Sequence, residues 1–344
     1  MPEPVDPRDY TLQELREFFL TKGLPAFRGN QLFVFMHKRR CRDFADLTTF
    51  SKALRRQMGQ WFHFSPVGIA QRQQGQDGTV KFLCSLADKE QVESVLLFNR
   101  DRPTACISTQ VGCRFGCAFC RTARLGFVRD LQVHEMVEQF ARMNDWLKEQ
   151  GKHIRNLVFM GMGEPMDNLD RVLKAAHILS AAGGYELSQR RMTISTCGHV
   201  PGIRRLARLR APQLAVSLNA PSQKKRQQLM PCARKWPLDE LMAALRAFFS
   251  QRQERVTLEY IMIKDVNDSP ADAQALIALL KPARAFKVNL IPLNPCESFN
   301  HQAPAMGRIE DFQAQLKAKR ISTHVRQTRG DDILAACGQL TAGR

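Results

Sequence analysis

The sequence lacks any long apolar segment. No stretch of its 344 residues approaches the roughly 18 continuous apolar residues that a membrane-spanning helix requires. The first twenty residues, MPEPVDPRDYTLQELREFFL, begin acidic and polar and do not carry the apolar core of a secretion signal. We therefore expect a cytoplasmic protein without a membrane partner.

Acidic residues are also scarce. The chain has 33 Asp and Glu against 51 Lys and Arg, which leaves a net charge of +18. Such a surplus repels itself unless an anionic partner neutralises it, and nucleic acid is the obvious partner. The alternative is a merely basic soluble enzyme, because a high pI describes solubility and not fold. The 44% of apolar residues can bury a substantial core in one large α/β domain or two domains, which excludes a disordered chain.

The ten cysteines are sparse for a chain of this length, except in one cluster. This distribution argues against a disulfide scaffold, and a reducing compartment favours metal or catalytic roles. The cluster is the segment CRFGCAFC, in which Cys113, Cys117 and Cys120 have the spacing CxxxCxxC. Three thiolates on one tight loop can bind three irons of a cubane cluster and leave the fourth iron open to a non-protein ligand.

Two alternatives to an iron–sulfur cluster stay open at this point. A structural zinc ion normally takes four protein ligands, usually from paired CxxC knuckles, and the sequence has no second knuckle. The three thiols could also share one loop by chance. We carry the iron–sulfur interpretation forward because a cubane with one open iron takes three protein ligands, and one loop can supply them.

Short helices are predicted at the start of the chain. Leu12, Leu15 and Phe18 recur at helical spacing, and a second apolar set follows a break at Gly29-Asn30. We expect residues 1–64 to form a small helical accessory domain that binds RNA.

From Val67 to Phe98 the apolar pattern shortens into strand-like pieces. Asp77-Gly78 lies between two of them and suits a tight hairpin turn. We therefore expect residues 65–102 to form a β-hairpin linker region.

Alternating strands and amphipathic helices follow Pro103. Repeated strand–helix units imply parallel strands with right-handed crossovers, which close wholly or partly into a barrel. We predict an α/β fold for residues 103–344, a partial (β/α)6 barrel with its chemistry at the carboxyl ends of the strands. The strand candidates are Ala105 to Ser108, Asn156 to Met160, Met192 to Ser195, Leu214 to Leu218, Val256 to Ile263 and Phe286 to Ile291.

The cysteine loop follows the first of these strands and has Phe119 before its last cysteine. The next strand ends in the turn GMGEP, whose glycines allow close backbone approach and whose Glu164 can accept from a ligand's ammonium group. Together these motifs resemble the radical S-adenosylmethionine superfamily. The resemblance implies a 4Fe-4S cluster whose open iron chelates the methionyl group of S-adenosylmethionine, and a 5′-deoxyadenosyl radical formed by its reductive cleavage.

A narrower resemblance extends from about Tyr10 to Leu340. A cysteine near the carboxyl terminus, Cys337 in TRGDDILAACGQL, is specific to the RlmN/Cfr family of adenosine methyltransferases. In isolation such a residue would more often be a buried helix cysteine. The matching segments are PAFRGNQ, DGTVKF, CISTQVGCRFGCAFCRTARLGF, MGMGEPMDNL, RRMTISTCG, VSLNAP, NLIPLNP and TRGDDILAACGQL.

Membership of this family implies methylation of an adenosine ring carbon in 23S rRNA, with tRNA as a second candidate substrate. The stretch RTARLGF resembles the RlmN branch, which favours carbon 2 over carbon 8. By the same resemblance Cys337 carries the methyl group as S-methylcysteine, and Cys106 releases the product through a transient disulfide with it. Glu93 matches the proton acceptor, although a strand Glu is often only a solvated edge residue and Cys106 could be core. An external electron donor such as flavodoxin is also implied.

The resemblance further implies a set of S-adenosylmethionine contacts. All of them follow predicted strands at the carboxyl ends, where a barrel would place its site. They are Gly163, Glu164, Ser195, Ser217, Leu218, Asn219 and Asn294.

Three tracts depart from the family pattern. Asn219 replaces the His of SLHAP, although an amide can still hydrogen-bond. The tract VPIN appears here as Met230-Pro231-Cys232-Ala233, and YIPE as Leu97-Phe98-Asn99-Arg100. These changes suggest a divergent paralogue.

Basic side chains near the proposed site favour RNA as the substrate, since such charges position a phosphate backbone. The target adenine must leave its stack to reach a buried cluster, so an unpaired nucleotide is expected. Lys38, Arg39 and Arg40 would supply a second grip. The basic side chains near the proposed site are Arg121, Arg124, Arg129, Arg190, Arg191, Arg204, Arg205, Arg208, Arg210, Lys224, Lys225 and Arg226.

Two other functions remain as alternatives to an RNA methyltransferase. One is another radical enzyme, and the other is a non-catalytic RNA-binding iron–sulfur protein.

Overall fold

The computed structural model describes residues 5–99, 102–209, 212–294 and 299–342. Its centre is a ten-stranded sheet in the order β1-β2-β3-β4-β7-β8-β9-β10-β11-β12. A separate two-stranded sheet pairs β5 (Gln110–Gly112) with β6 (Phe127–Asp130). Within the described ranges, no helix has the length and apolar character needed to cross a membrane.

The parallel part of the sheet confirms the predicted open barrel. All six candidate strands are present with ends shifted by a few residues, and the sheet does not close on itself. Sequence reasoning missed a seventh parallel strand, β12 (Ser322–Val325), because it is four residues long and three of the four are polar. The six confirmed strands are β4 (Arg102–Cys106), β7 (Asn156–Phe159), β8 (Met192–Thr196), β9 (Gln213–Ser217), β10 (Val256–Met262) and β11 (Phe286–Pro292).

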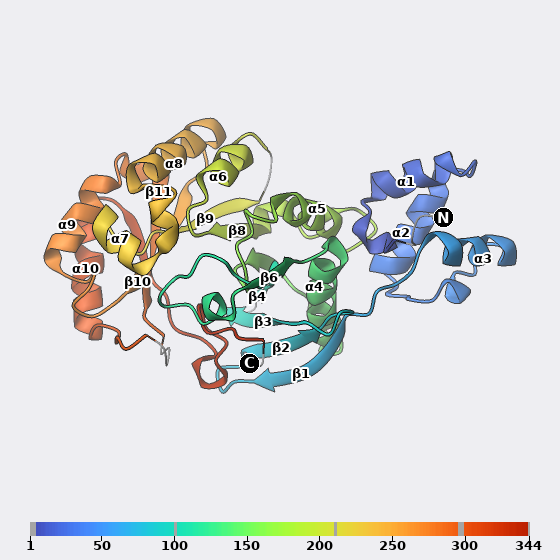
Figure 1. Ribbon diagram of the computed structural model, residues 1–344, viewed down its shortest axis with the longest axis horizontal. Helices are drawn as coiled ribbons and strands as arrows, with labels where there is room; N and C mark the ends of the chain where they lie inside the picture. The colour runs from blue at the N-terminus through green and yellow to red at the C-terminus, as the bar shows by residue number, and fades with distance from the viewer. Residues whose placement is uncertain (1–4, 100–101, 210–211, 295–298, 343–344) are drawn as a thin grey trace.

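Helices cover one face of this parallel sheet (Figure 1). Strand side chains alternate between the two faces. In β10, Leu258 and Tyr260 are fully buried, whereas Glu259 between them is partly exposed on the concave side. Polar residues of the barrel therefore line an open concave face. The helices are α4 (Val133–Lys148), α5 (Leu169–Ser180), α6 (Val200–Ala207), α8 (Leu238–Arg252), α9 (Pro270–Leu279) and α10 (Met306–Ala318). The short α7 (Gln223–Leu229) lies instead at the carboxyl ends of the strands, where the Leu229 carbonyl accepts a 3.0 Å hydrogen bond from the Ala118 N–H of the cysteine loop.

Three antiparallel strands extend the sheet beyond β4, and we call them the wing. They are β1 (Gly68–Gln74), β2 (Val80–Ser85) and β3 (Gln91–Asn99). Gly78 turns the β1–β2 hairpin with a φ of 83°, as the Asp77-Gly78 dipeptide predicted. Since β3 pairs with β4, opposite Cys106, the wing continues the concave face of the barrel. The domain boundaries at residues 64 and 102 stay predictions.

The amino-terminal segment is helical, with α1 (Leu12–Thr21), α2 (Phe27–His37) and α3 (Lys52–Trp61). The expected break at Gly29-Asn30 is wrong, because Gly29 lies inside α2. A Cβ atom on Gly29 would lie 2.6 Å from the backbone nitrogen of Arg16 in α1. The glycine therefore permits a close helix crossing instead of ending a helix.

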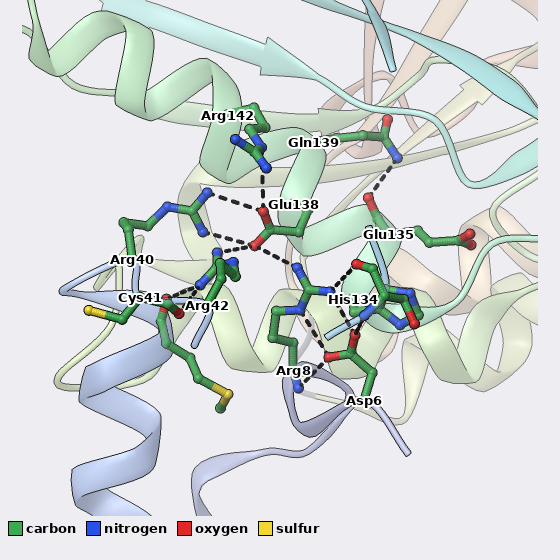
Figure 2. Close-up of polar contacts among 12 residues, drawn as sticks. Asp6, Arg8, Arg40, Cys41, Arg42, His134, Glu135, Glu138, Gln139 and Arg142 are labelled. Atoms are coloured by element: carbon green, nitrogen blue, oxygen red, sulfur yellow. Dashed lines mark hydrogen bonds and ion pairs between the residues drawn. The ribbon is translucent and has the colours of Figure 1, made fainter. Parts of the chain in front are cut away.

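A buried charge network fixes this helical segment to α4 (Figure 2). Glu138 of α4 is fully buried and forms ion pairs with Arg8, Arg40 and Arg42. Burial alone would raise the pKa of Glu138, but the arginines, Arg40 foremost, hold it well below its ordinary value. Arg40 also contacts Asp145 at 2.7 Å and is mostly buried, so its expected role in an RNA grip is wrong.

Candidate functional site

The cysteine loop runs from β5 to a short 3-10 helix, Thr122–Leu125. It leaves the strand at Gly112, whose φ is 74°. A Cβ atom there would lie 1.8 Å from the carbonyl oxygen of Gly126, which accepts a 2.8 Å hydrogen bond from the Cys113 N–H. Only glycine fits this approach, and the closed loop is what turns Cys113, Cys117 and Cys120 toward one another.

The three thiols are electrostatic neighbours. Burial raises the pKa of Cys113 to about 12, and burial followed by the charge of Cys120 raises the pKa of Cys117 well above its ordinary value. As free thiols they would stay protonated, so a metal is what would hold them as thiolates. In the part of the chain that the structure describes, no three His, Cys, Asp or Glu side chains converge tightly enough for a single ion. A cubane takes one thiolate for each of three irons, which matches the three cysteines of this loop, whereas structural zinc normally takes four protein ligands.

Glu164 lies beside this loop. The turn before it requires glycine, because a Cβ atom on Gly163, whose φ is 98°, would lie 2.5 Å from the Gln110 side chain. Gln110 in turn accepts a 2.8 Å hydrogen bond from the Glu164 N–H. The carboxylate of Glu164 accepts from the N–H groups of Met166 and Cys197. Burial raises its pKa, and its charge acts on Cys113 and Cys117. The carboxylate is thus buried next to the cysteines, with each of its oxygens bonded to a backbone N–H group.

The remaining predicted cofactor contacts lie at the carboxyl ends of neighbouring strands. Ser195 and Ser217 are partly exposed near the ends of β8 and β9. Leu218 is buried and bonds to the β10 backbone. Asn219 has a φ of 58°, which Asn tolerates, and its amide oxygen accepts a 2.9 Å hydrogen bond from the Ile261 N–H. The Asn219 side chain therefore holds the loop to β10.

The carboxyl-terminal segment, residues 326–342, packs on the cysteine loop. The Arg121 N–H donates to the Gly338 carbonyl at 2.7 Å, and the Thr122 hydroxyl donates to the Leu340 carbonyl at 2.8 Å. A Cβ atom on Gly338 would lie 3.0 Å from the Phe119 carbonyl oxygen. These contacts carry Cys337 to the edge of the proposed cluster site, far from its place in the sequence.

Cys337 is solvent-exposed, yet protein surrounds it on most sides, so it lies on the wall of the concave face. Asn294 donates a 3.1 Å hydrogen bond to its carbonyl oxygen. Burial raises the pKa of Cys337, and the charges of Glu259 and Cys120 raise it further. Cys106 is buried in β4, and after burial the charge of Cys337 is the next influence that raises its pKa. The two predicted mechanistic thiols therefore face the same space.

Glu93 is only 2% exposed, so it is not a solvated edge residue. One carboxylate oxygen contacts the Lys81 ammonium at 3.1 Å. The other accepts from the N–H groups of Thr341 at 2.6 Å and Ala342 at 3.2 Å. Glu93 thus ties the wing to the segment that carries Cys337.

Sequence reasoning missed a polar row on the concave face. Glu259 of β10 lies opposite Ser217 of β9 and Asn289 of β11 in the sheet register. Asn289 donates a 2.9 Å hydrogen bond to its carboxylate. The signal was present, because a Glu in the otherwise apolar run VTLEYIM is expensive to bury without a purpose.

Several basic residues predicted at the RNA surface have structural partners. Arg226 is fully buried, and its guanidinium donates to the carbonyls of Cys197 and Ser217, which holds the ends of β8 and β9 together. Arg129 pairs with Glu135. Arg190 and Arg191 are exposed, whereas Arg210, like Arg100, lies outside the described residues. Only part of the basic surplus is therefore available to a substrate.

Comparison with known proteins identifies the class of the fold and site. The model of the radical SAM superfamily matches residues 107–277. A crystal structure of a radical SAM methyltransferase from Sphaerobacter thermophilus matches with a TM-score of 0.93 and 40% identity, covering 98% of this chain and 100% of that one. The protein is a radical S-adenosylmethionine enzyme, and the cofactors of this class are a 4Fe-4S cluster and S-adenosylmethionine.

The particular family follows from full-length relatives. The dual-specificity RNA methyltransferase RlmN of Syntrophobacter fumaroxidans is 42% identical over 340 residues, 99% of each chain. The probable dual-specificity RNA methyltransferase RlmN of Aquifex aeolicus is also 42% identical and covers 98% of this chain and 97% of its own length. Residues 5–63 match the ribosomal RNA large subunit methyltransferase N-terminal domain. The chain belongs to the RlmN family of radical S-adenosylmethionine methyltransferases, which decides against the two alternative functions.

Proposed function

We propose that this protein methylates carbon 2 of an adenosine in 23S rRNA and in tRNA, in the cytoplasm. The single observation that carries the proposal is the packing of the segment with Cys337 on the cysteine loop, where the charge of Cys337 acts on Cys106 at the end of β4. Cys106 lies in the first barrel strand and Cys337 lies near the carboxyl terminus. Folding alone does not require thiols from such distant segments to face the same space. The relatives named as dual-specificity RNA methyltransferases support RNA of two kinds as the substrate.

The cluster and S-adenosylmethionine, when bound, supply the methyl group and the radical chemistry that an electron-poor ring carbon requires. Cys113, Cys117 and Cys120 would hold the cluster, and Glu164 would take the ammonium group of the cofactor. A one-electron donor such as flavodoxin would deliver the electron. Arg114 of the cysteine loop and Val128 of β6 are solvent-exposed and thus accessible to such a donor.

Three residues of the chain would carry out the methyl transfer, the proton transfer and the product release. Cys337, on the exposed wall, carries the methyl group and presents it to the base. Cys106 stays buried behind it and releases the product. Its thiolate attacks the Cys337 sulfur, so an S–S bond forms as the S–CH2 bond to the product breaks, and the CH2 carbon takes up a proton to become the methyl group. Glu93 accepts a proton from the base. It already accepts hydrogen bonds from two backbone N–H groups and contacts the Lys81 ammonium, so its direction is fixed.

The test is mass spectrometry of nucleosides from ribosomal and transfer RNA of cells with and without this protein. We expect 2-methyladenosine to disappear from both RNAs when the gene is deleted. The appearance of 8-methyladenosine instead would move the reaction to the other ring carbon. Unchanged methyladenosine in both RNAs would contradict the proposal.

A further inference from the structure

A polar cleft of about 290 Å³ lies beside the proposed reaction site, between the wing and the carboxyl-terminal segment. Its volume is close to the lower end of the range of small-ligand pockets, roughly 300 to 1,000 Å³. That is room for one base or nucleotide and not for a duplex. The lining residues are Gln71, Gln73, Lys81, Leu83, Glu93, Arg121, Leu334 and Thr341.

The strand register explains why these side chains share the cleft. Gln71 lies opposite Leu83, and Gln73 lies opposite Lys81, so all four project from the same face of the wing. Arg72 projects from the other face, where its guanidinium lies over the Trp146 ring. The cleft face is therefore the concave face that continues toward Cys106.

Some of the lining side chains already have hydrogen-bond or ion-pair partners within the protein, and others do not. Lys81 and Glu93 bond to each other, and Glu93 also holds the carboxyl-terminal segment. In contrast, the described part of the chain offers no hydrogen bond to the side-chain amides of Gln71 and Gln73, and no ion pair to the Arg121 guanidinium. The cleft thus presents two open amides and one cation, which suits a ligand with a hydrogen-bonding edge and a negative group.

We propose that this cleft binds the nucleotide that flanks the target adenosine in the RNA. Arg121 pairs with its phosphate, and Gln71 and Gln73 hydrogen-bond to the edge of its base. An unstacked RNA base exposes such an edge, and amide side chains read base edges well. The assignment rests on the proposed function and refines it. Glu93 forms one wall of the cleft, but neither Cys337 nor a cluster cysteine lines it. The cleft therefore borders the reacting base at Glu93, and its occupant is the neighbouring nucleotide.

The experiment measures kcat/KM for short RNA hairpins that carry each of the four nucleotides on either side of the target adenosine. The wild-type protein should prefer one flanking nucleotide. A good amide contact to a base edge is worth ~1–3 kcal/mol, so the double variant Gln71→Ala/Gln73→Ala should lose roughly 5-fold to 150-fold of that preference. Arg121→Ala should raise KM about equally for all sequences and lower the salt slope of RNA affinity by about one. Arg121→Lys should restore part of this affinity.

Matched controls come from the opposite face of the same strand. Gln74→Ala and Arg72→Ala remove the same groups outside the cleft and should leave the flanking preference unchanged. Iron content and the RNA-independent methyl label on Cys337 should be normal in every cleft variant, which shows that the variants are folded.

The inference would be overturned if the wild-type protein had no flanking preference. It would also be overturned if the glutamine variants kept that preference, or if they lost kcat alone, since loss of kcat alone would place the target base in the cleft. Failure of the proposed function is separate, because then the wild-type protein would make no methyladenosine on any hairpin.

Discussion

At the scale of single residues, the two thiols Cys106 and Cys337 have unequal surroundings. Cys106 is buried in β4, whereas Cys337 is exposed on a segment held by Asn294 and Glu93. An exposed thiol can reach a large substrate such as RNA. A buried one can only act on a neighbour, so the geometry supports an early role for Cys337 and a late role for Cys106.

We therefore expect their alanine variants to fail at different stages. Cys337→Ala should carry no protein-bound methyl label from S-adenosylmethionine and should form no RNA adduct. Cys106→Ala should still be methylated at Cys337 and should accumulate RNA joined to that residue, seen as a nuclease-resistant mass increase on its peptide. Both should retain the cluster. Normal turnover by Cys106→Ala, or an adduct on another residue, would refute the two-thiol assignment.

The cluster ligands give a second prediction at this scale. Anaerobically purified protein should be brown and bind close to four irons per chain, as a cubane requires. Replacing Cys113, Cys117 or Cys120 with Ala should abolish both the iron and the methylation. Cys84→Ala is the matched control, because that thiol is buried in the wing next to Ser94. Stoichiometric zinc without iron after anaerobic reconstitution would contradict this assignment.

At the scale of elements, glycine decides how the cysteine loop and the carboxyl-terminal segment meet. Gly338 has a φ of 83°, and a Cβ atom there would lie only 3.0 Å from the Phe119 carbonyl oxygen. The segment is otherwise held by a few backbone hydrogen bonds and by the Glu93 carboxylate. Its position is therefore sensitive to a single methyl group.

Gly338→Ala should loosen this segment. The strained φ alone costs about 1–3 kcal/mol in a non-glycine residue. We expect faster hydrogen exchange at residues 330–342 and at least a tenfold lower methylation rate, with normal iron content. Gly307→Ala in α10 is the control, since a Cβ atom there meets nothing within 4 Å. Equal exchange in the two variants would show that the contact with Phe119 does not hold the segment.

At the scale of the whole molecule, the helical segment is held on α4 by the network around Glu138 (Figure 2). A buried carboxylate shared by several arginines is costly to remove, because Arg42 then loses its carboxylate partner, while Arg8 and Arg40 keep Asp6 and Asp145. The network would therefore keep a second RNA contact at a constant distance from the cysteine loop. Figure 1 shows the same arrangement, with α1 to α3 on the side of α4 and α5 away from α8 and α9.

Glu138→Ala should destabilise the protein by about 3–5 kcal/mol. We expect a lower melting temperature and a higher KM for RNA, while the methyl label on Cys337, which needs no RNA, stays normal. Glu240→Ala removes a carboxylate from an exposed ion pair with Arg204 and should change stability by less than about 1 kcal/mol. If the Glu138 variant kept the wild-type KM for RNA, the helical segment would have no positioning role.

The sequence by itself determined the features that depend on local pattern. Six parallel strands, the Asp77-Gly78 hairpin and the cysteine loop could be predicted because their signals lie within a few neighbouring residues. The short polar strand β12 had too weak a signal. Only the tertiary structure decided which groups face each other across the chain.

Contacts between distant segments are the physical reason for the rest. Gly29 was predicted to separate two helices, because nothing nearby in the sequence shows that α1 crosses α2 at this residue. From the sequence, Arg40 looked like a surface charge. In the structure it is mostly buried and forms an ion pair with Glu138 of α4. The partners of Glu93 and the cleft beside it exist only once the carboxyl-terminal segment packs against the wing, so no local pattern could have predicted them.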